Sequence, residues 1–346
     1  MNLDFGVIDH LDFQAIPIHQ TFDERVEQIV QYDRDGFHAY HLTEHHFTPH
    51  GLASSPLAFL SAVSRLTKRI KLVPTVLVLP TYHPLRLAEE ICMLDQLSHG
   101  RFEFGTGKGV VPHELALFGI NPPIAGDMAK EVAEILMKAL DNDSVTHRGK
   151  YYDFYDVPMI LRPYKPFADR GSWIVSGRPE AARDAGRKGD NVLSIMNPAK
   201  LKPLVDSYLD GWAETHGPGA PTSKIGLTRH VFVAESQDEA VARGEFGFAG
   251  WFANHSWMWN RFDHSRGAGD DAPYRAHKAM IFGTPDYVKA ELKAQLEEAG
   301  GNINYVAPRF AFGNLSQEEV MRSYALFRDE VMPAFRDNAA SSQLAA

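Results

Sequence analysis

The chain has 346 residues, of which 44% are hydrophobic and 11% aromatic, enough to bury a large core. Its formal net charge is −9, from 44 acidic and 35 basic residues, and the basic side chains are scattered. This charge argues against nucleic acid and membrane surfaces as partners. The single cysteine, Cys92, excludes any internal disulfide and any thiolate zinc cluster.

The first residues resemble a strand and not a secretory leader, and no run approaches the roughly 18 apolar residues of a membrane span. A lone cysteine also suits a reducing compartment. We therefore expect a cytoplasmic protein.

Short apolar runs alternate with longer amphipathic segments along the chain. The expected strands are residues 3–8, 39–43, 70–79, 101–105, 173–175, 191–195, 226–234 and 304–307. The expected helices are residues 22–34, capped by Thr21, and residues 56–66, 84–97, 127–140, 180–187, 199–216, 237–244, 285–299 and 317–335. This order predicts a (β/α)8 TIM barrel and not a doubly wound sheet, because no Gly-x-Gly-x-x-Gly loop follows the first strand.

Three segments depart from the βα rhythm. Residues 151–166 carry tyrosines and prolines and are expected to form an insertion with short hairpin strands. Residues 246–274 are first aromatic and then, at 265–271, polar and glycine-rich, which is typical of a mobile loop. We expect a single domain over residues 1–336 and a disordered tail at 337–346.

Histidines gather after the second expected strand, where a barrel places active-site residues. Glu44 precedes His45 and His46, and His50 follows four residues later. A neutral imidazole suits general acid–base catalysis, and purely structural histidines are the alternative. Because no His-Glu-x-x-His motif or second closely spaced ligand pair is present, we expect no metal site.

Two further strand ends carry groups that suit an anion. Gly107 and Lys108 follow the fourth expected strand, and Ser176 and Gly177 follow the fifth and lead into a helix. The glycine-rich run is not a Walker loop, because its glycine spacing is too short. A phosphate site shared by both ends is one interpretation, and a tight turn with a solvated lysine is the other.

Several motifs resemble the bacterial luciferase-like flavin-dependent monooxygenase family. They are TEHHFT at residues 43–48, VLPTYHPLR at 78–86, LDQLSHGRFEFG at 94–105, FGTP at 282–285 and DEVMP at 329–333. The resemblance covers nearly the whole chain. It is specific for the family and carries little information on the substrate.

The resemblance implies a TIM barrel that binds reduced FMN as a diffusing co-substrate. Together with O2 it forms a flavin C4a-peroxide, which then oxygenates a small apolar organic substrate. The enzyme would be the FMNH2-dependent part of a two-component monooxygenase, supplied by a separate flavin reductase because no NAD(P) fingerprint is visible. A deazaflavin-dependent oxidoreductase on the same barrel and a non-catalytic flavin-binding subunit are the alternatives.

The resemblance also assigns roles to individual residues. His45 matches the catalytic histidine, and the bond between Thr75 and Val76 matches a non-proline cis peptide that lies against the flavin ring. The other implied flavin contacts are Gly107, Lys108, Ser176 and Gly177. An implied hydrogen-bond cluster at the interface of a homodimer consists of His46, His83 and Glu89.

The chain departs from the family's luciferases at the flavin site. Lys108 stands in place of a phosphate-binding arginine, Gly107 in place of a reactive cysteine and Ser176 in place of an acidic residue. The aromatic residues at 251–262 favour a bulky apolar substrate such as a terpenoid or a cyclic ketone, unless they belong to the core or to an interface. The dimer would use the helix at 56–66, whose small side chains permit close approach, together with the helix at 84–97. Packing within the chain is the alternative.

Overall fold

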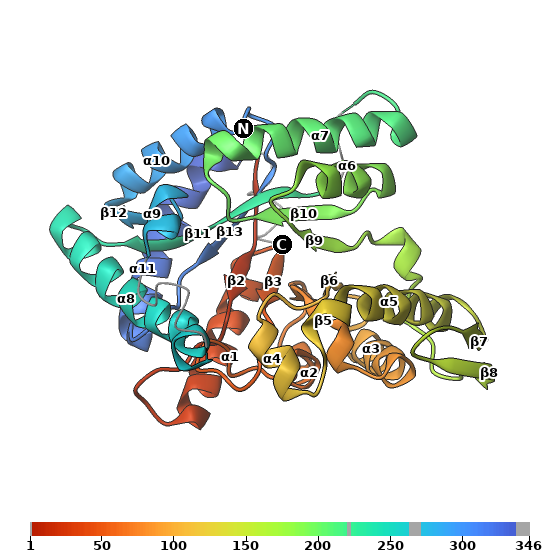
Figure 1. The fold of residues 1–346 in the computed structure, drawn as a ribbon. Coiled ribbons are helices and arrows are strands. Elements are labelled where there is room, and N and C mark those ends of the chain that lie inside the picture. Colours follow the sequence, from red (N-terminus) through yellow and green to blue (C-terminus); the bar gives the residue numbers. More distant parts are fainter. Residues whose placement is uncertain (1, 220–222, 263–270, 337–346) are drawn as a thin grey trace.

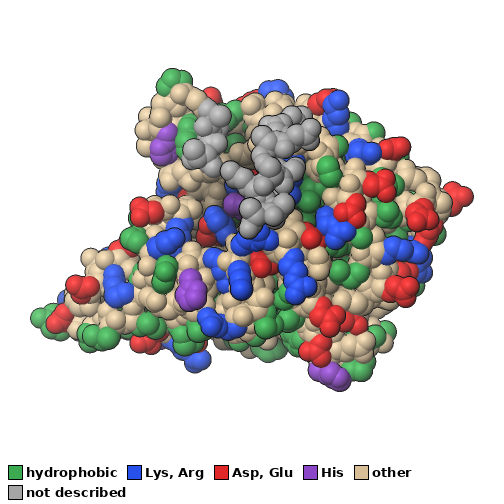
Figure 2. Space-filling view, turned by 180° about the vertical axis from the view of Figure 1, so that it is seen from behind, with side chains coloured by type: hydrophobic (Ala, Val, Ile, Leu, Met, Phe, Trp, Pro, Cys, Tyr) green, Lys and Arg blue, Asp and Glu red, His purple; other side chains and the backbone are tan. Residues whose placement is uncertain are grey.

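The structure, a computed structural model, describes residues 2–219, 223–262 and 271–336. The tail expected at 337–346 lies outside the described residues, and so does the loop expected at 265–271 except for Asp271. Among the described residues, no helix is both long enough and apolar enough to span a membrane. Figure 2 shows acidic and basic side chains intermingled over one face of the molecule.

Parallel strands form a closed barrel with helices outside it (Figure 1). The strands of its first half are β1 (Asp4–Phe5), β2 (Val7–Asp9), β3 (Ala39–Leu42), β4 (Lys71–Pro74), β5 (Leu77–Val78) and β6 (Thr106–Gly107). Those of its second half are β9 (Trp173–Val175), β10 (Asn191–Ser194), β11 (Ile225–Val233), β12 (Met280–Gly283) and β13 (Tyr305–Arg309). The predicted (β/α)8 barrel is confirmed.

The barrel closes through short pairings. One sheet has the order β2-β3-β4, a second pairs β5 with β6, and a third has the order β1-β13-β11-β10-β9. Single bridges join Leu72 to Phe102 and Gly105 to Trp173, which connects the sheets around the fourth strand. The first expected strand divides at Gly6, where a Cβ would lie 1.7 Å from the hydroxyl oxygen of Tyr305. The bare backbone there lets the strand pass from one sheet to the other.

Helices follow the strands as expected, with shifted ends. The α-helices are α1 (Ile18–Arg34), α2 (Pro56–Ser64), α3 (Pro84–Ser98), α4 (Pro112–Leu117), α5 (Ala125–Asp141), α6 (Pro179–Lys188), α7 (Pro198–His216), α8 (Gln237–Phe262), α9 (Ala272–Ala276), α10 (Pro285–Glu298) and α11 (Gln317–Leu326). Six of these α-helices begin with proline, whose fixed φ and missing N–H suit a first helical turn. Ser316 and Glu319 form a capping box at the start of α11.

Single-turn helices join these elements. They are the 3-10 helices η1 (Leu79–Thr81), η2 (Pro122–Ile124), η3 (Phe167–Asp169) and η5 (Met332–Phe335), and the π-helix η4 (Phe327–Val331). The expected helix at 317–335 is therefore α-helical only to Leu326. Pro333 lacks the N–H that would continue the α-helical pattern.

Several expected boundaries were wrong. Thr21 does not cap α1 but lies buried inside it. The segment expected at 151–166 contributes β8 (Asp153–Pro158), whose antiparallel partner β7 (Ser144–Arg148) begins earlier. Strand β12 was not expected, and it pairs with the last residues of β11.

The aromatic segment after residue 246 is helical, which was also not expected. Helix α8 continues to Phe262, because Gly244 and Gly247 make room for neighbouring side chains. A Cβ would lie 2.4 Å from Phe282 Cγ at Gly244 and 2.7 Å from Leu315 Cγ at Gly247. Because they lack a Cβ, these glycines let α8 lie close to the barrel.

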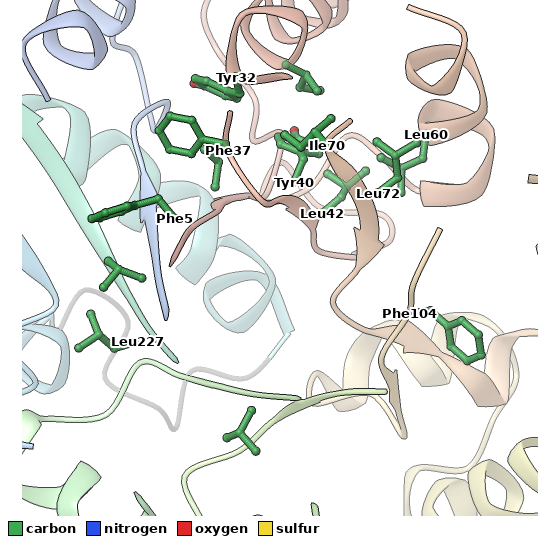
Figure 3. Close-up of a cluster of buried hydrophobic side chains, with 14 of the residues drawn as sticks. Phe5, Tyr32, Phe37, Tyr40, Leu42, Leu60, Ile70, Leu72, Phe104 and Leu227 are labelled. Carbon is green, nitrogen blue, oxygen red and sulfur yellow. The ribbon is translucent and has the colours of Figure 1, made fainter. Parts of the chain in front are cut away.

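The core fills the space between strands and helices (Figure 3). Phe5 comes from β1 and Leu227 from β11, two strands of the same sheet, and Leu60 comes from α2. A buried ion pair sits beside this core, with Arg25 Nε 2.8 Å from Asp9 Oδ2. Tyr40 donates its hydroxyl to the same oxygen at 2.8 Å. This network fixes the end of β2, where the candidate site begins.

Candidate functional site

A cavity of about 550 Å³ opens at the carboxyl ends of the barrel strands. It has the size of a small-molecule or cofactor site. Its lining includes His45 and all the predicted cofactor contacts, namely Thr75, Val76, Gly107, Lys108, Ser176 and Gly177. Residues far apart in the sequence therefore share one cavity, as the barrel rule predicts.

The cavity has an apolar strip that comes from two strand ends. Val76 and Val78 lie at the start and end of the segment that includes β5, and Ile174 and Val175 belong to β9. Val175 is 50% exposed although it ends a barrel strand. Exposed β-branched side chains around a cavity provide a surface for a flat apolar ring.

Gly107 lets the end of β6 lie close to Val76. A Cβ at Gly107 would lie 2.6 Å from Val76 Cγ2, closer than real contacts allow. The peptide bond between Thr75 and Val76 is cis, as the resemblance implies. Thr75 is held from behind, because its Oγ1 lies 2.9 Å from His41 Nδ1 in the barrel interior.

The rim of the cavity carries two cations. Lys108 and Arg178 both line it and are exposed. Neither forms an ion pair within the described residues. Ser176 lies beside them, and its Oγ accepts a hydrogen bond from the backbone N–H of Arg178 at 3.1 Å. Because α6 begins at Pro179, its N-terminal end adds a favourable field for an anion.

His45 is held in the cavity wall by a carboxylate. Its Nδ1 lies 2.9 Å from Glu114 Oε1, and the two side chains are 13% and 9% exposed. A carboxylate accepts, so Nδ1–H donates and Nε2 stays available to hold or release a proton. Glu114 lies in the first turn of α4, which the sequence left unassigned.

Glu44 and His46 belong to a separate buried network. Glu44 Oε1 lies 2.8 Å from His46 Nε2, and Glu44 Oε2 accepts from Tyr82 Oη at 2.8 Å and from the backbone N–H of Val78 at 3.2 Å. The carboxylate and burial together raise the pKa of the Tyr82 hydroxyl, burial being the larger cause. This network fixes the turn after β5.

The structure does not bring together the three residues assigned to a dimer interface. His46 is buried against Glu44, whereas His83 and Glu89 are exposed on the turn before α3 and on α3 itself. The ring of His83 packs against Tyr152 at a centroid distance of 5.7 Å. No hydrogen bond joins the three within residues 2–219. An interface role for them stays a prediction.

Behind His45 lies a group of buried imidazoles. The ring centroid of His50 is 4.2 Å from that of His10 and 4.7 Å from that of His45. Burial lowers the pKa of His10 and of His50 well below the usual value, and neighbouring cationic side chains add to this effect. These two rings are therefore neutral at neutral pH.

Side chains of helix α8 pack against His10 and His50. The ring of Trp251 contacts His10 and His50 at centroid distances of 5.6 and 5.3 Å. His255 Nδ1 lies 3.3 Å from His50 Nε2, and its own Nε2 lies 2.9 Å from Tyr274 Oη. The pKa of His255 is lowered to about 4, chiefly by burial. Trp251 is 2% exposed, so it belongs to the core beneath the site and not to an open mouth.

Gly51 sets the spacing between two of the imidazole-bearing segments. A Cβ there would lie 2.9 Å from His45 Cβ and 3.3 Å from the carbonyl oxygen of His10. The two segments are also tied by backbone hydrogen bonds, from Leu52 N to Leu11 O at 2.9 Å and from Phe13 N to Pro49 O at 2.8 Å. His10, His45 and His50 are thus held as one unit.

Sequence reasoning missed Glu114, His10 and the contribution of α8. A signal for Glu114 was present, because Pro112 and an acidic residue two positions later are typical of a helix start. His10 stands at the first strand end, directly after Asp9. Its approach to His50 depends on the closure of the barrel, which local spacing does not show.

Comparisons with known proteins agree with this geometry. The family model described as luciferase-like monooxygenase matches residues 3–303. A protein of Sinorhizobium fredii is 35% identical over 95% of this chain and 96% of its own length. The limonene 1,2-monooxygenase of Rhodococcus erythropolis is 26% identical over 97% of this chain and 88% of its own.

Solved structures show the same fold. The monooxygenase RslO1 from Streptomyces bottropensis superimposes with a TM-score of 0.82 at 25% identity, covering 96% of this chain and 100% of its own. The oxygenating constituent of the 3,6-diketocamphane monooxygenase of Pseudomonas putida, a type II Baeyer–Villiger enzyme solved with FMN, gives a TM-score of 0.78 at 24% identity. That comparison covers 96% of this chain and 99% of the other.

Proposed function

Since the chain belongs to the luciferase-like monooxygenase family, we propose that it is the oxygenase component of a two-component, reduced-FMN-dependent monooxygenase. The observation that carries the proposal is the cavity, in which His45, an apolar strip and two rim cations face one space. The overall reaction would convert a substrate, O2 and reduced FMN into an oxygenated product, water and oxidised FMN.

The residues present fit FMN. Lys108 and Arg178 would bind the phosphate, with Ser176 and the start of α6 supplying neutral donors. Val76 and Val175 would contact the faces of the isoalloxazine ring. Reduced FMN would supply the two electrons that oxygenation requires.

His45 would accept and return protons beside the flavin. With Nδ1–H donated to Glu114, the Nε2 lone pair can take a proton from a bound group and return it. The side chain is 13% exposed, so bulk water has little access to it. Glu114 acts as a positioning residue, because it holds the tautomer and the ring orientation of His45.

The substrate would be a small, mainly apolar organic molecule, and the reductase would be a separate protein. The Pseudomonas putida relative is the oxygenating constituent of its monooxygenase, which supports a separate reductase. The apolar strip of Val76, Val78, Ile174 and Val175 supports an apolar substrate.

The experiment combines a flavin reductase, FMN and a panel of ketones and terpenoids under isotopically labelled O2. We expect one labelled oxygen atom in the product, detected by mass spectrometry. Hydride transfer from a reduced deazaflavin without oxygen incorporation would contradict the proposal in favour of a deazaflavin oxidoreductase. Flavin binding without any product over the whole panel would favour a non-catalytic subunit.

Flavin binding is tested separately by comparing FMN with riboflavin, which lacks the phosphate. Lys108→Ala should weaken FMN binding roughly tenfold and leave riboflavin binding unchanged, since a charge-assisted phosphate contact contributes about 1.5–3 kcal/mol. Lys108→Arg is the matched control and should retain FMN affinity. Equal losses for both ligands would place the phosphate elsewhere.

We also propose a homodimer through α2 and α3. Leu66, directly after α2, is 57% exposed, and Met93 on α3 is 50% exposed. Exposed apolar side chains on adjacent helices are typical of subunit contacts. Sedimentation at micromolar concentration should show a dimer, and Met93→Glu should shift it towards monomer. A monomeric wild-type protein would remove the interface role of His46, His83 and Glu89.

A further inference from the structure

The three imidazoles of His10, His45 and His50 form a group with the geometry of a metal site. One nitrogen of each ring lies within 4.8 Å of the other two. The residues come from the ends of β2 and β3 and from the loop that follows β3. We propose that they bind a divalent transition-metal ion of the zinc type, with a fourth position open to water or a small ligand.

Hydrogen bonds determine which nitrogens are free to bind a metal. His45 Nδ1 is taken by Glu114 at 2.9 Å, and His50 Nε2 by His255 Nδ1 at 3.3 Å. His45 Nε2 and His50 Nδ1 are left as donor atoms. In His10 we assign Nδ1 as the donor atom, because it is buried without a hydrogen-bond partner among the described residues.

Two of these donor atoms are buried without a partner. Nδ1 of His10 and Nδ1 of His50 have no hydrogen bond to any residue that the structure describes. A buried polar atom without a partner costs about 1–3 kcal/mol. Coordination of an ion by both rings would satisfy these atoms together.

One of the three rings, that of His45, has an outer contact of the kind that metal-binding histidines use. A ligating imidazole nearly always donates its second N–H to a carboxylate, carbonyl or water, which fixes the ring. Glu114 does this for His45. For His50 the same position is occupied by His255, which Tyr274 holds in turn at 2.9 Å.

The donor set selects the class of metal. Neutral imidazoles suit zinc, copper and nickel, whereas calcium and magnesium prefer oxygen ligands. Zinc–nitrogen bonds of about 2.0–2.1 Å place tetrahedral donors about 3.4 Å apart. Separations of up to 4.8 Å would therefore close by at most about 1.4 Å through small side-chain rotations.

The expectation of no metal site rested on local spacing around His45. That spacing did not include His10, which the barrel brings in from another strand. The inference does not depend on the proposed oxygenation. It has one consequence for that reaction, because an ion on His45 Nε2 excludes a proton from the same atom.

The test uses the full-length, metal-free protein with Co2+ and Zn2+ as probes. We expect one Co2+ per chain with the visible bands of a tetrahedral site, and Zn2+ that displaces it. His10→Gln and His50→Gln should each weaken Zn2+ binding at least tenfold, and Glu114→Gln about tenfold, as outer-shell changes do. His19→Gln, which alters an exposed histidine, is the control and should bind as wild type.

Circular dichroism establishes that each variant is folded. X-ray absorption of the zinc-loaded wild-type protein needs no variant, and it should count three imidazole ligands. Fewer than three imidazoles, an octahedral cobalt spectrum, or unchanged binding in both folded His10→Gln and His50→Gln would overturn the inference.

Discussion

His45 Nδ1 lies 2.9 Å from Glu114 Oε1, and the pair joins the end of β3 to the first turn of α4. The contact sets the tautomer of the imidazole and directs Nε2 away from the carboxylate. It connects two segments that the sequence separates by 69 residues. The chemistry of the site therefore depends on how α4 packs against the barrel.

Replacement of this pair should affect turnover more than flavin binding. His45→Gln should lower kcat by about 10²–10⁴-fold, the range for loss of a general acid or base. Glu114→Gln should lower kcat roughly tenfold, because the amide holds the ring less firmly. Steady-state kinetics at saturating reduced FMN, with a flavin titration of each variant, provide the measurement. A loss of flavin affinity with unchanged kcat would assign Glu114 a purely structural role.

Gly107→Ala should weaken flavin binding. The new Cβ would lie 2.6 Å from Val76 Cγ2, so Val76, which lines the cavity, must shift. Overpacking of this kind costs about 1–3 kcal/mol, which corresponds to a loss in FMN affinity of roughly tenfold or more. Gly126→Ala is the control, since its Cβ meets Lys108 Cδ at an ordinary 3.8 Å. Fluorescence titration with FMN measures both, and equal affinities would contradict the prediction.

Arg25→Met should destabilise the fold strongly. The change leaves Asp9 buried without its cation, which costs about 3–5 kcal/mol in unfolding free energy. Arg86→Met removes an exposed partner of Glu90 and should cost less than about 1 kcal/mol. Urea unfolding of both variants checks the contrast. A small effect of Arg25→Met would show that Tyr40 and Leu11 alone stabilise the Asp9 carboxylate.

His41 should make the protein sensitive to acid. Burial lowers its pKa from 6.5 to about 3, with a smaller contribution from His38 and Lys71. Below the unfolded-state pKa the unfolded chain binds a proton that the native ring does not, so stability is lost as the pH falls from about 6.5 towards 3. One such group contributes a slope of at most about 1.4 kcal/mol per pH unit.

Urea unfolding at several pH values between 7.5 and 5 measures this slope. His41→Gln should reduce the slope of unfolding free energy against pH by the contribution of one histidine, because an amide does not titrate. His19→Gln, on the surface, should leave it unchanged. The prediction is refuted by a slope in His41→Gln that equals that of the wild-type protein.

The barrel was predictable because its signals are local. The strand at Ala39–Leu42 is short and apolar, and Pro84 fixes the start of α3. Once the barrel was assumed, the rule that strand ends share one face placed His45, Thr75 and Ser176 together. The cavity that they line agrees with this step.

What the sequence did not show depends on packing between distant segments. Gly244 and Gly247 lie inside α8, where they accommodate Phe282 and Leu315. Glu114 and His10 carried weak local signals, and their distances to His45 follow from the closed barrel. Contacts of this kind have no periodicity along the chain, so a pattern in the sequence does not report them.

Gly51 restricts which homologues can hold the His10 and His45 segments this close together. Any side chain at this position would collide with His45 Cβ at 2.9 Å and press on the His10 backbone at 3.3 Å. A homologue with alanine or a larger residue here must hold the two segments further apart. Among related chains, the close approach of His10 to His45 should therefore occur together with glycine at 51. Transplanting the histidines into a barrel without that glycine should give rings too far apart to act on one ligand.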